Sequence, residues 1–145
     1  MSQPKHLSQP SRSGGCLCGA IRYGFAVDPV ATVHCHCRDC QRVTGSGFAT
    51  VFGVASADLV IEGAATLGSY SLQAQTGQTV TRQFCSNCGS ALFTKAQNNP
   101  DMLWIKAGSL DNGDWLEPTA SCWTGSAAAW APPAPGLEQH AGNPS

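Results

Sequence analysis

The chain has 145 residues, enough for one domain with a hydrophobic core and too few for two of ordinary size. Its eight Lys and Arg and nine Asp and Glu give a net charge of −1. The basic residues are scattered, which argues against nucleic acid as a partner. No apolar run approaches the roughly 20 residues that span a bilayer, so we expect no membrane association. The N-terminal stretch MSQPKHLSQPSRSGG is polar and lacks an apolar signal core, which predicts a cytoplasmic protein.

Composition divides the chain into a flexible lead (residues 1–13), a folded domain (14–130) and an irregular tail rich in Pro and Gly (131–145). Within the domain, short apolar segments with Val, Thr and aromatic residues are separated by turn residues, which predicts strands. In chain order these segments are 19–27, 47–54, 58–62, 66–72, 79–84, 90–94, 102–107 and 120–124. Only the stretch CRDCQRV (37–43) indicates a helical turn. The fold class is therefore mainly β, with mostly antiparallel strands.

Eight cysteines in a reducing compartment indicate metal binding rather than disulfides. In an extended C-x-C segment the two side chains point to one face with Cα atoms roughly 6.6 Å apart, so both sulfurs can bind one ion. In C-x-x-C-G the chain turns back on itself, and the glycine permits a positive φ. Thiolate-rich tetrahedral sites select zinc or iron–sulfur, and we expect zinc. Seven cysteines fall into three clusters: Cys16 and Cys18; Cys35, Cys37 and Cys40; Cys85 and Cys88.

The spacing leaves open which clusters share an ion. We favour joining the first cluster to the third, because both end in Cys-Gly and together they supply four sulfurs for a closed structural site. Such a zinc would fasten the start of the domain to its middle and supply folding free energy on the order of 10 kcal/mol. The alternative joins the first cluster to Cys37 and Cys40 and leaves Cys35 unpaired.

The middle cluster lies in the stretch HCHCRDC, which also holds two histidines. If this stretch is extended, Cys35 and Cys37 point to one face while His34 and His36 point to the other, which argues against both histidines as ligands. Cys122 is predicted to be a small buried residue, with a role as fourth ligand or substrate trap as the alternative. Three protein ligands with one exchangeable position are the pattern of a catalytic zinc.

Four stretches, GGCLCGAIRY, HCHCRDCQRVTGSGFAT, FCSNCGSALF and IKAGSLD, resemble in this order the motifs of the glutathione-dependent formaldehyde-activating enzymes. This superfamily also includes centromere protein V, and the resemblance covers about residues 14–125. It implies a β-tent fold, in which two layers of short antiparallel strands are joined by a structural zinc. It implies two zinc ions per chain, one structural and one catalytic. The implied ligands are Cys16, Cys18, Cys85 and Cys88 for the structural zinc, and Cys35, Cys37 and Cys40 for the catalytic zinc.

The resemblance implies a carbon–sulfur lyase that condenses formaldehyde, or a similar aldehyde, with glutathione or another small thiol to an S-hydroxymethyl adduct. Free thiols have a pKa of about 8.5, and a zinc with an open position can lower it. The chain departs from the family in PTASCWTG, where Ser121 and Cys122 stand at positions at which His and an apolar residue are common. The alternative function is a non-catalytic zinc-binding interaction module, and an exchangeable ligand on the second zinc would discriminate the two.

Charged and polar side chains near the middle cluster are candidates for supporting roles. Three thiolates leave a zinc site with a net charge of −1. Arg38 and Arg42 could offset this charge or hold a substrate carboxylate, or they could be solvated surface residues. Asp39, Thr44 and Ser46 lie close enough in the sequence to support the metal ligands through hydrogen bonds.

Overall fold

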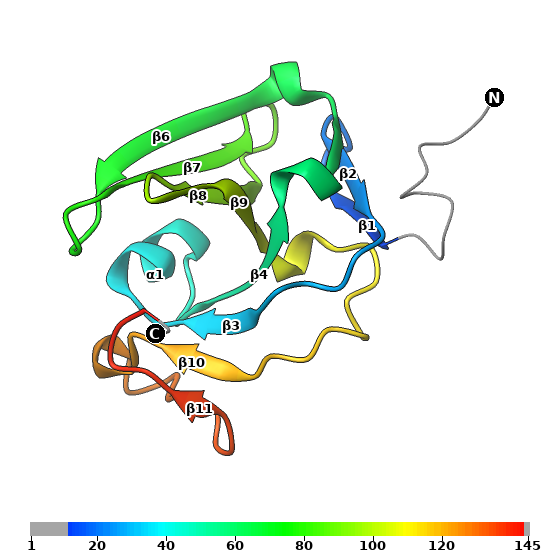
Figure 1. Ribbon diagram of the computed structural model, residues 1–145. Helices are drawn as coiled ribbons and strands as arrows, with labels where there is room; N and C mark the ends of the chain where they lie inside the picture. The colour runs from blue at the N-terminus through cyan, green and yellow to red at the C-terminus, as the bar shows by residue number, and fades with distance from the viewer. Residues whose placement is uncertain (1–11, 144–145) are drawn as a thin grey trace.

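The computed structural model describes residues 12–143, which form two sheets and one α-helix (Figure 1). The helix α1 spans Arg38–Thr44. The strands are β1 (Arg12–Gly15), β2 (Arg22–Phe25), β3 (Thr32–Cys35), β4 (Ala49–Ala55), β5 (Val60–Glu62), β6 (Leu67–Gln73), β7 (Thr79–Cys85), β8 (Ala91–Ala96), β9 (Asn99–Lys106), β10 (Ala120–Cys122) and β11 (Glu138–Gln139).

The small sheet has the order β1-β2-β5, and the large sheet has the order β11-β10-β3-β4-β9-β8-β7-β6. The predicted mainly-β, two-layer architecture is confirmed, and each of the eight predicted segments contains a strand. The strands β1, β3 and β11 were not among the predicted segments; β1 reads RSGG, which is too rich in glycine to give a strand pattern. The strand β10 pairs in parallel with both β3 and β11, so the sheet is not wholly antiparallel.

The two faces of the large sheet have different partners, because side chains alternate along each strand. On one face, Phe52 and Val54 of β4 and Ile105 of β9 are almost fully buried against the small sheet. On the other face, Ala49 and Val51 of β4 belong to a second apolar cluster together with cysteines of the α1 region. Figure 1 shows the large sheet curving so that its β6–β8 end and its β3–β10 end lie on either side of α1.

The GSLD part of the IKAGSLD motif connects the small sheet to the large one. Ser109 donates a hydrogen bond to the Lys106 carbonyl at 2.7 Å, and its hydroxyl lies 2.6 Å from that of Tyr23 in β2. Asp111 accepts hydrogen bonds from Ser13 of β1 and from Arg22 of β2. The GSLD stretch therefore has a structural role, since its hydrogen bonds hold the small sheet against the end of β9.

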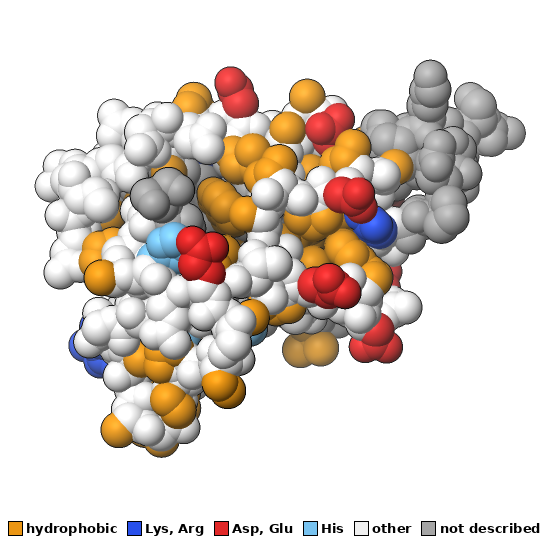
Figure 2. All heavy atoms as spheres, turned by 60° about the horizontal axis from the view of Figure 1, so that its bottom comes forward, with side chains coloured by type: hydrophobic (Ala, Val, Ile, Leu, Met, Phe, Trp, Pro, Cys, Tyr) orange, Lys and Arg blue, Asp and Glu red, His pale blue; other side chains and the backbone are white. Residues whose placement is uncertain are grey.

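The predicted division of the chain into lead, domain and tail stays a prediction. Residues 1–11 of the predicted lead lie outside the described residues. Part of the predicted tail takes part in the sheet, since β11 pairs with β10 through Glu138 and Gln139. Charged side chains lie scattered on the face of the molecule shown in Figure 2, without a continuous basic stripe on that face. Across residues 12–143, none of the helical segments has the length and apolar character needed to cross a bilayer.

Candidate metal centres

Four cysteines from two distant turns meet at the junction of the two sheets. Cys16 and Cys18 lie in the turn between β1 and β2, while Cys85 ends β7 and Cys88 lies in the turn that leads to β8. Their four sulfur atoms lie within 4.8 Å of one another. The predicted joining of the first and third clusters therefore matches the geometry. We call this group the four-cysteine cluster.

The spacing of these sulfurs fits a tetrahedral zinc site. The Sγ atoms of Cys16 and Cys18 are 3.6 Å apart, and those of Cys18 and Cys85 are 3.8 Å apart. Zn–S bonds of about 2.3 Å at tetrahedral angles place sulfurs about 3.8 Å apart. The donor set and its dimensions are therefore those that zinc requires.

Both turns aim backbone N–H groups at the sulfurs. The Ile21 amide donates to the Cys16 Sγ at 3.2 Å, and the Cys88 amide donates to the Cys85 Sγ at 3.4 Å. The glycines that follow the second cysteine of each pair both have a positive φ, +82° at Gly19 and +80° at Gly89, and the C-x-x-C-G pattern predicts this for Gly89. This backbone conformation lets the chain turn back around the sulfurs without steric strain.

The acidities of the thiols in this cluster diverge. Hydrogen bonds from Ser90 are the main cause that lowers the pKa of Cys88 to about 5. Burial is the main cause that raises the pKa of Cys85 to about 11. A cation bound between sulfurs this close together would favour the thiolate form of all four.

The middle cluster forms a second group, here called the three-cysteine cluster. Cys35 ends β3, Cys37 is the N-cap residue of α1, and Cys40 lies in the first helical turn. The Cys40 amide, in the first turn of the helix, donates a hydrogen bond to the Cys37 Sγ at 3.2 Å. The three sulfurs lie within 4.8 Å of one another, and no further His, Cys, Asp or Glu joins them within residues 12–143.

Neither histidine of this stretch joins the sulfurs. His34 forms a hydrogen bond of 2.7 Å through Nδ1 with the hydroxyl of Thr50, on the adjacent strand β4. His36 is 1 % exposed and packs against Phe48, with ring centroids 5.0 Å apart. The alternation of side chains along an extended chain, which predicts that neither histidine is a metal ligand, accounts for the positions of both rings.

Cys122 is buried, as predicted, and lies beside the three-cysteine cluster without belonging to it. Its Cα is the register partner of Cys35 in the parallel pair β10 and β3. It is 2 % exposed, and its carbonyl accepts a hydrogen bond of 3.0 Å from the His36 amide. Burial is the main cause that raises the pKa of its thiol to about 11.

The predicted supporting residues of α1 take different positions. Arg38 donates a hydrogen bond to the side chain of Gln41 within the helix, while Arg42 is exposed. The Thr44 hydroxyl donates to the Cys40 carbonyl at 2.8 Å, and the Ser46 amide in turn donates to that hydroxyl. Asp39 lies in the first turn of α1, where its negative charge favours the helix.

Two cations that sequence reasoning missed lie near the three-cysteine cluster. Lys106 of β9 is 8 % exposed, and burial lowers the pKa of its ammonium group. The pKa of Cys40 is lowered to about 2, first by hydrogen bonds from Cys35 and Cys37 and further by the charges of Arg82 and Lys106. The period-2 alternation of β7 and β9 is the sequence signal that could have placed both side chains on the face of the large sheet that carries the three-cysteine cluster.

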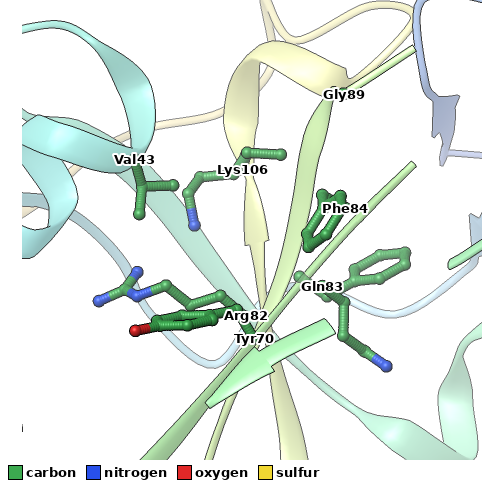
Figure 3. A pocket seen from close by; sticks show the side chains of 9 residues that line it. Val43, Tyr70, Arg82, Gln83, Phe84, Gly89 and Lys106 are labelled. Atoms are coloured by element: carbon green, nitrogen blue, oxygen red, sulfur yellow. The ribbon is translucent and has the colours of Figure 1, made fainter. Parts of the chain in front are cut away.

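Lys106 and Arg82 line a cavity of about 240 Å³ between α1 and the strands β6–β9. In Figure 3 the nitrogen ends of both side chains lie toward Val43 of α1, whereas the side chain of Gln83 extends away from them. Val43 is three residues after Cys40, so both residues lie on neighbouring positions of one helix face. The remaining lining residues are Tyr70, Gly89, Ala91 and Phe93.

Comparisons with known proteins agree with this arrangement. Residues 11–126 match the family model of the glutathione-dependent formaldehyde-activating enzymes. A protein of Halomonas elongata named as a putative glutathione-dependent formaldehyde-activating enzyme is 31 % identical over 103 residues, which cover 68 % of this chain and 65 % of that protein. An uncharacterized lyase of Schizosaccharomyces pombe is 29 % identical over 98 residues, which cover 68 % of this chain and 67 % of that protein.

The fold has a counterpart among solved structures. A crystal structure of a Rhodobacter sphaeroides protein superposes with a TM-score of 0.57 at 23 % identity, covering 73 % of this chain and 96 % of that one. This likeness concerns the fold alone. The family match spans both sulfur clusters and the strands that carry them. The chain belongs to the glutathione-dependent formaldehyde-activating enzyme family.

Proposed function

We propose that this chain is a zinc-dependent carbon–sulfur lyase. Its reaction would condense formaldehyde, or a similar small aldehyde, with glutathione or another small thiol to an S-hydroxymethyl adduct. The observation that carries the proposal is the three-cysteine cluster, which offers three sulfurs and no fourth ligand within residues 12–143. Membership of the family and the names of the two relatives support the same reaction class.

The proposal assigns different roles to the two clusters. The four-cysteine cluster would hold a structural zinc, because four thiolates complete a tetrahedral sphere. The three-cysteine cluster would hold a catalytic zinc through Cys35, Cys37 and Cys40, because three protein ligands leave one position for an exchangeable molecule. Eight free thiols fit a reducing compartment, so we also propose a cytoplasmic location.

The reaction forms one carbon–sulfur bond and converts the aldehyde C=O bond into a C–OH group. The thiol sulfur supplies the electron pair to the carbonyl carbon, and the proton of the thiol ends on the carbinol oxygen. A zinc bound at this site supplies Lewis acidity and lowers the pKa of a thiol. The protein itself contributes the positive charges of Lys106 and Arg82, which favour negative charge near the cluster.

An NMR exchange assay with ¹³C-labelled formaldehyde tests the proposed reaction. The zinc-loaded protein should accelerate formation and breakdown of the hydroxymethyl adduct with at least one thiol of a panel that includes glutathione. Cys37→Ser should abolish the acceleration and lower the zinc content from two ions per chain to one. If the wild-type protein with two zinc ions gives only the uncatalysed rate with every thiol, the lyase proposal is wrong and a non-catalytic zinc module is the better interpretation.

A further inference from the structure

The strand register places Lys106 on the same face of the large sheet as the three-cysteine cluster. Cys35 of β3 is the register partner of Ala49 in β4. Val51 lies two residues further along β4 and is the partner of Lys106 in β9. Because paired residues and residues two apart share a face, Cys35 and Lys106 point to the same side.

The strand register also places Arg82 on this face of the large sheet, two strands away from Lys106. It is the partner of Thr94 in β8, and Thr94 is the partner of Trp104 in β9. Trp104 is two residues before Lys106, so all four side chains share one face. The Lys106 Nζ donates to the Thr94 hydroxyl at 3.1 Å, and its strand β9 lies between the Cys35 strand β3 and the Arg82 strand β7 in the sheet.

Both cations lack an acidic partner among the described residues. The ion pairs within residues 12–143 join Arg12 to Asp28, Arg22 to Asp111 and His140 to Glu138, and so involve neither cation. Lys106 is 92 % buried, being 8 % exposed, and the Nε atom of Arg82 is buried without a hydrogen-bond partner. Burying an unpaired charge is energetically unfavourable, so a bound anion would stabilise this arrangement.

The three-cysteine cluster neutralises only part of this charge. Three thiolates and one divalent ion carry a net charge of −1, whereas the two cations together carry +2. The cavity that they line has no Asp or Glu among its lining residues. Its other walls are largely apolar, with Val43, Phe84 and Phe93 on them, and suit a short aliphatic chain.

We propose that Lys106 and Arg82 form an anion subsite that binds the carboxylate of the thiol substrate while its sulfur reaches the three-cysteine cluster. This inference rests on the proposed lyase function and names its substrate class as thiols that bear a carboxylate. The guanidinium of Arg82 offers two parallel donors to a carboxylate, and the ammonium of Lys106 adds a third. A cavity of about 240 Å³ holds a short mercapto acid entirely, or one carboxylate end of a longer peptide thiol.

Binding of two isosteric thiols to the zinc-loaded protein tests the subsite by isothermal titration calorimetry without aldehyde. The probes are 3-mercaptopropionate and its uncharged amide. Wild type should bind the acid about 10-fold or more tightly than the amide, because hydrogen bonds to a charged carboxylate are stronger than hydrogen bonds to a neutral amide. Lys106→Met should weaken binding of the acid by about 10-fold and that of the amide by less than about 2-fold, on the same basis. Lys106→Arg should restore most of the preference.

The matched control is Lys95→Met, because Lys95 is an exposed residue next to Thr94 on β8 and points to the opposite face. It should leave the preference unchanged. Arg82→Gln, at a partly exposed position, repeats the test should Lys106→Met fail to fold. Equal weakening of both probes in the cation variants, or no preference in wild type, would overturn the subsite.

The two proposals fail separately. If the protein accelerates adduct exchange equally with the acid and the amide, the lyase function stands and the carboxylate subsite falls. If the acid binds selectively through Lys106 but no thiol shows accelerated exchange, the subsite stands and the lyase function falls. The zinc content of each variant shows whether a weaker affinity for the thiol arises from metal loss instead of from loss of the cation.

Discussion

Replacing Cys88 with serine should destabilise the fold far more than the same replacement at Cys37. The four-cysteine cluster joins segments that are 67 residues apart between Cys18 and Cys85. A cross-link that closes a loop of this length stabilises a fold by about 4 kcal/mol in the chain-entropy model. The three-cysteine cluster joins residues at most five positions apart, which β3 and α1 already hold together.

The local contacts sharpen this contrast. Cys37 is the N-cap of α1, and serine is a preferred N-cap residue, so Cys37→Ser retains the hydrogen bond from the Cys40 amide. Serine at position 88 cannot supply the thiolate that completes the four-sulfur set. For a chain of this size, a loss of about 4 kcal/mol lowers the melting temperature by roughly 10 °C. We expect a decrease of about that size for Cys88→Ser and of no more than about 3 °C for Cys37→Ser.

Thermal unfolding followed by circular dichroism, with zinc content measured on the same samples, checks this prediction. Cys122→Ser is the matched control, since Cys122 is a buried cysteine outside both clusters. It reports the cost of placing a hydroxyl in the core, which is ~1–3 kcal/mol. Equal decreases for Cys88→Ser and Cys37→Ser would refute the division between a structural and a catalytic cluster.

Three further perturbations follow from the same structure. Chelation of zinc should remove the proposed catalytic ion before the fold is lost. Adduct exchange should therefore stop at chelator concentrations at which the circular dichroism spectrum is unchanged. Simultaneous loss of exchange activity and of the folded spectrum would contradict separate roles for the two clusters. Hydrogen bonds from Arg22 and then Ser13 lower the pKa of Asp111 in the folded state. The contribution of the Asp111 carboxylate to the free energy of unfolding is therefore fully present above pH about 4, and it is lost as the pH falls through the lower folded-state pKa. Asp111→Asn should therefore reduce the free energy of unfolding by at most ~1 kcal/mol at pH 7, since the pair is half exposed, and the difference from wild type in urea titrations should shrink below pH 4. Gly63 has a φ of +81°, and a Cβ there would lie 1.9 Å from the Ala20 carbonyl oxygen, so Gly63→Ala should cost more than ~2 kcal/mol. Gly77 has a φ of +87° and open space, so Gly77→Ala should cost only ~1 kcal/mol by the same titration, and equal costs would show that the clash is relieved.

The residues of the IKAGSLD motif take part in two different features of the structure. The stretch GSLD holds the two sheets together through Ser109 and Asp111, and contributes nothing directly to the sulfur clusters. Lys106, three residues before Ser109, points to the other side and lines the cavity. The seven-residue motif IKAGSLD thus contributes both to the contacts between the sheets and to the proposed anion subsite.

The sequence by itself determined the local structure. Short apolar segments gave eight of the strands, and CRDCQRV gave the position of the only α-helix within residues 12–143. The spacing of the cysteines predicted which sulfurs within a turn lie together, and the glycine of the C-x-x-C-G turn, Gly89, predicted a positive φ. These features depend on a few neighbouring residues, whose backbone geometry is fixed by alternation and turn chemistry.

The tertiary structure decided which distant segments meet. Spacing favoured joining the first and third cysteine clusters without excluding the alternative, and the pairing follows from the way the β1–β2 turn meets the β7–β8 turn. The neighbourhood of Lys106, Arg82 and Cys40 depends on the strand order β3-β4-β9-β8-β7, as does the cavity that the two cations line. Alternation tells which side chains of one strand share a face, but it carries no information on which strand becomes the neighbour. The proposed site depends on four successive strand pairings, from β3 to β7.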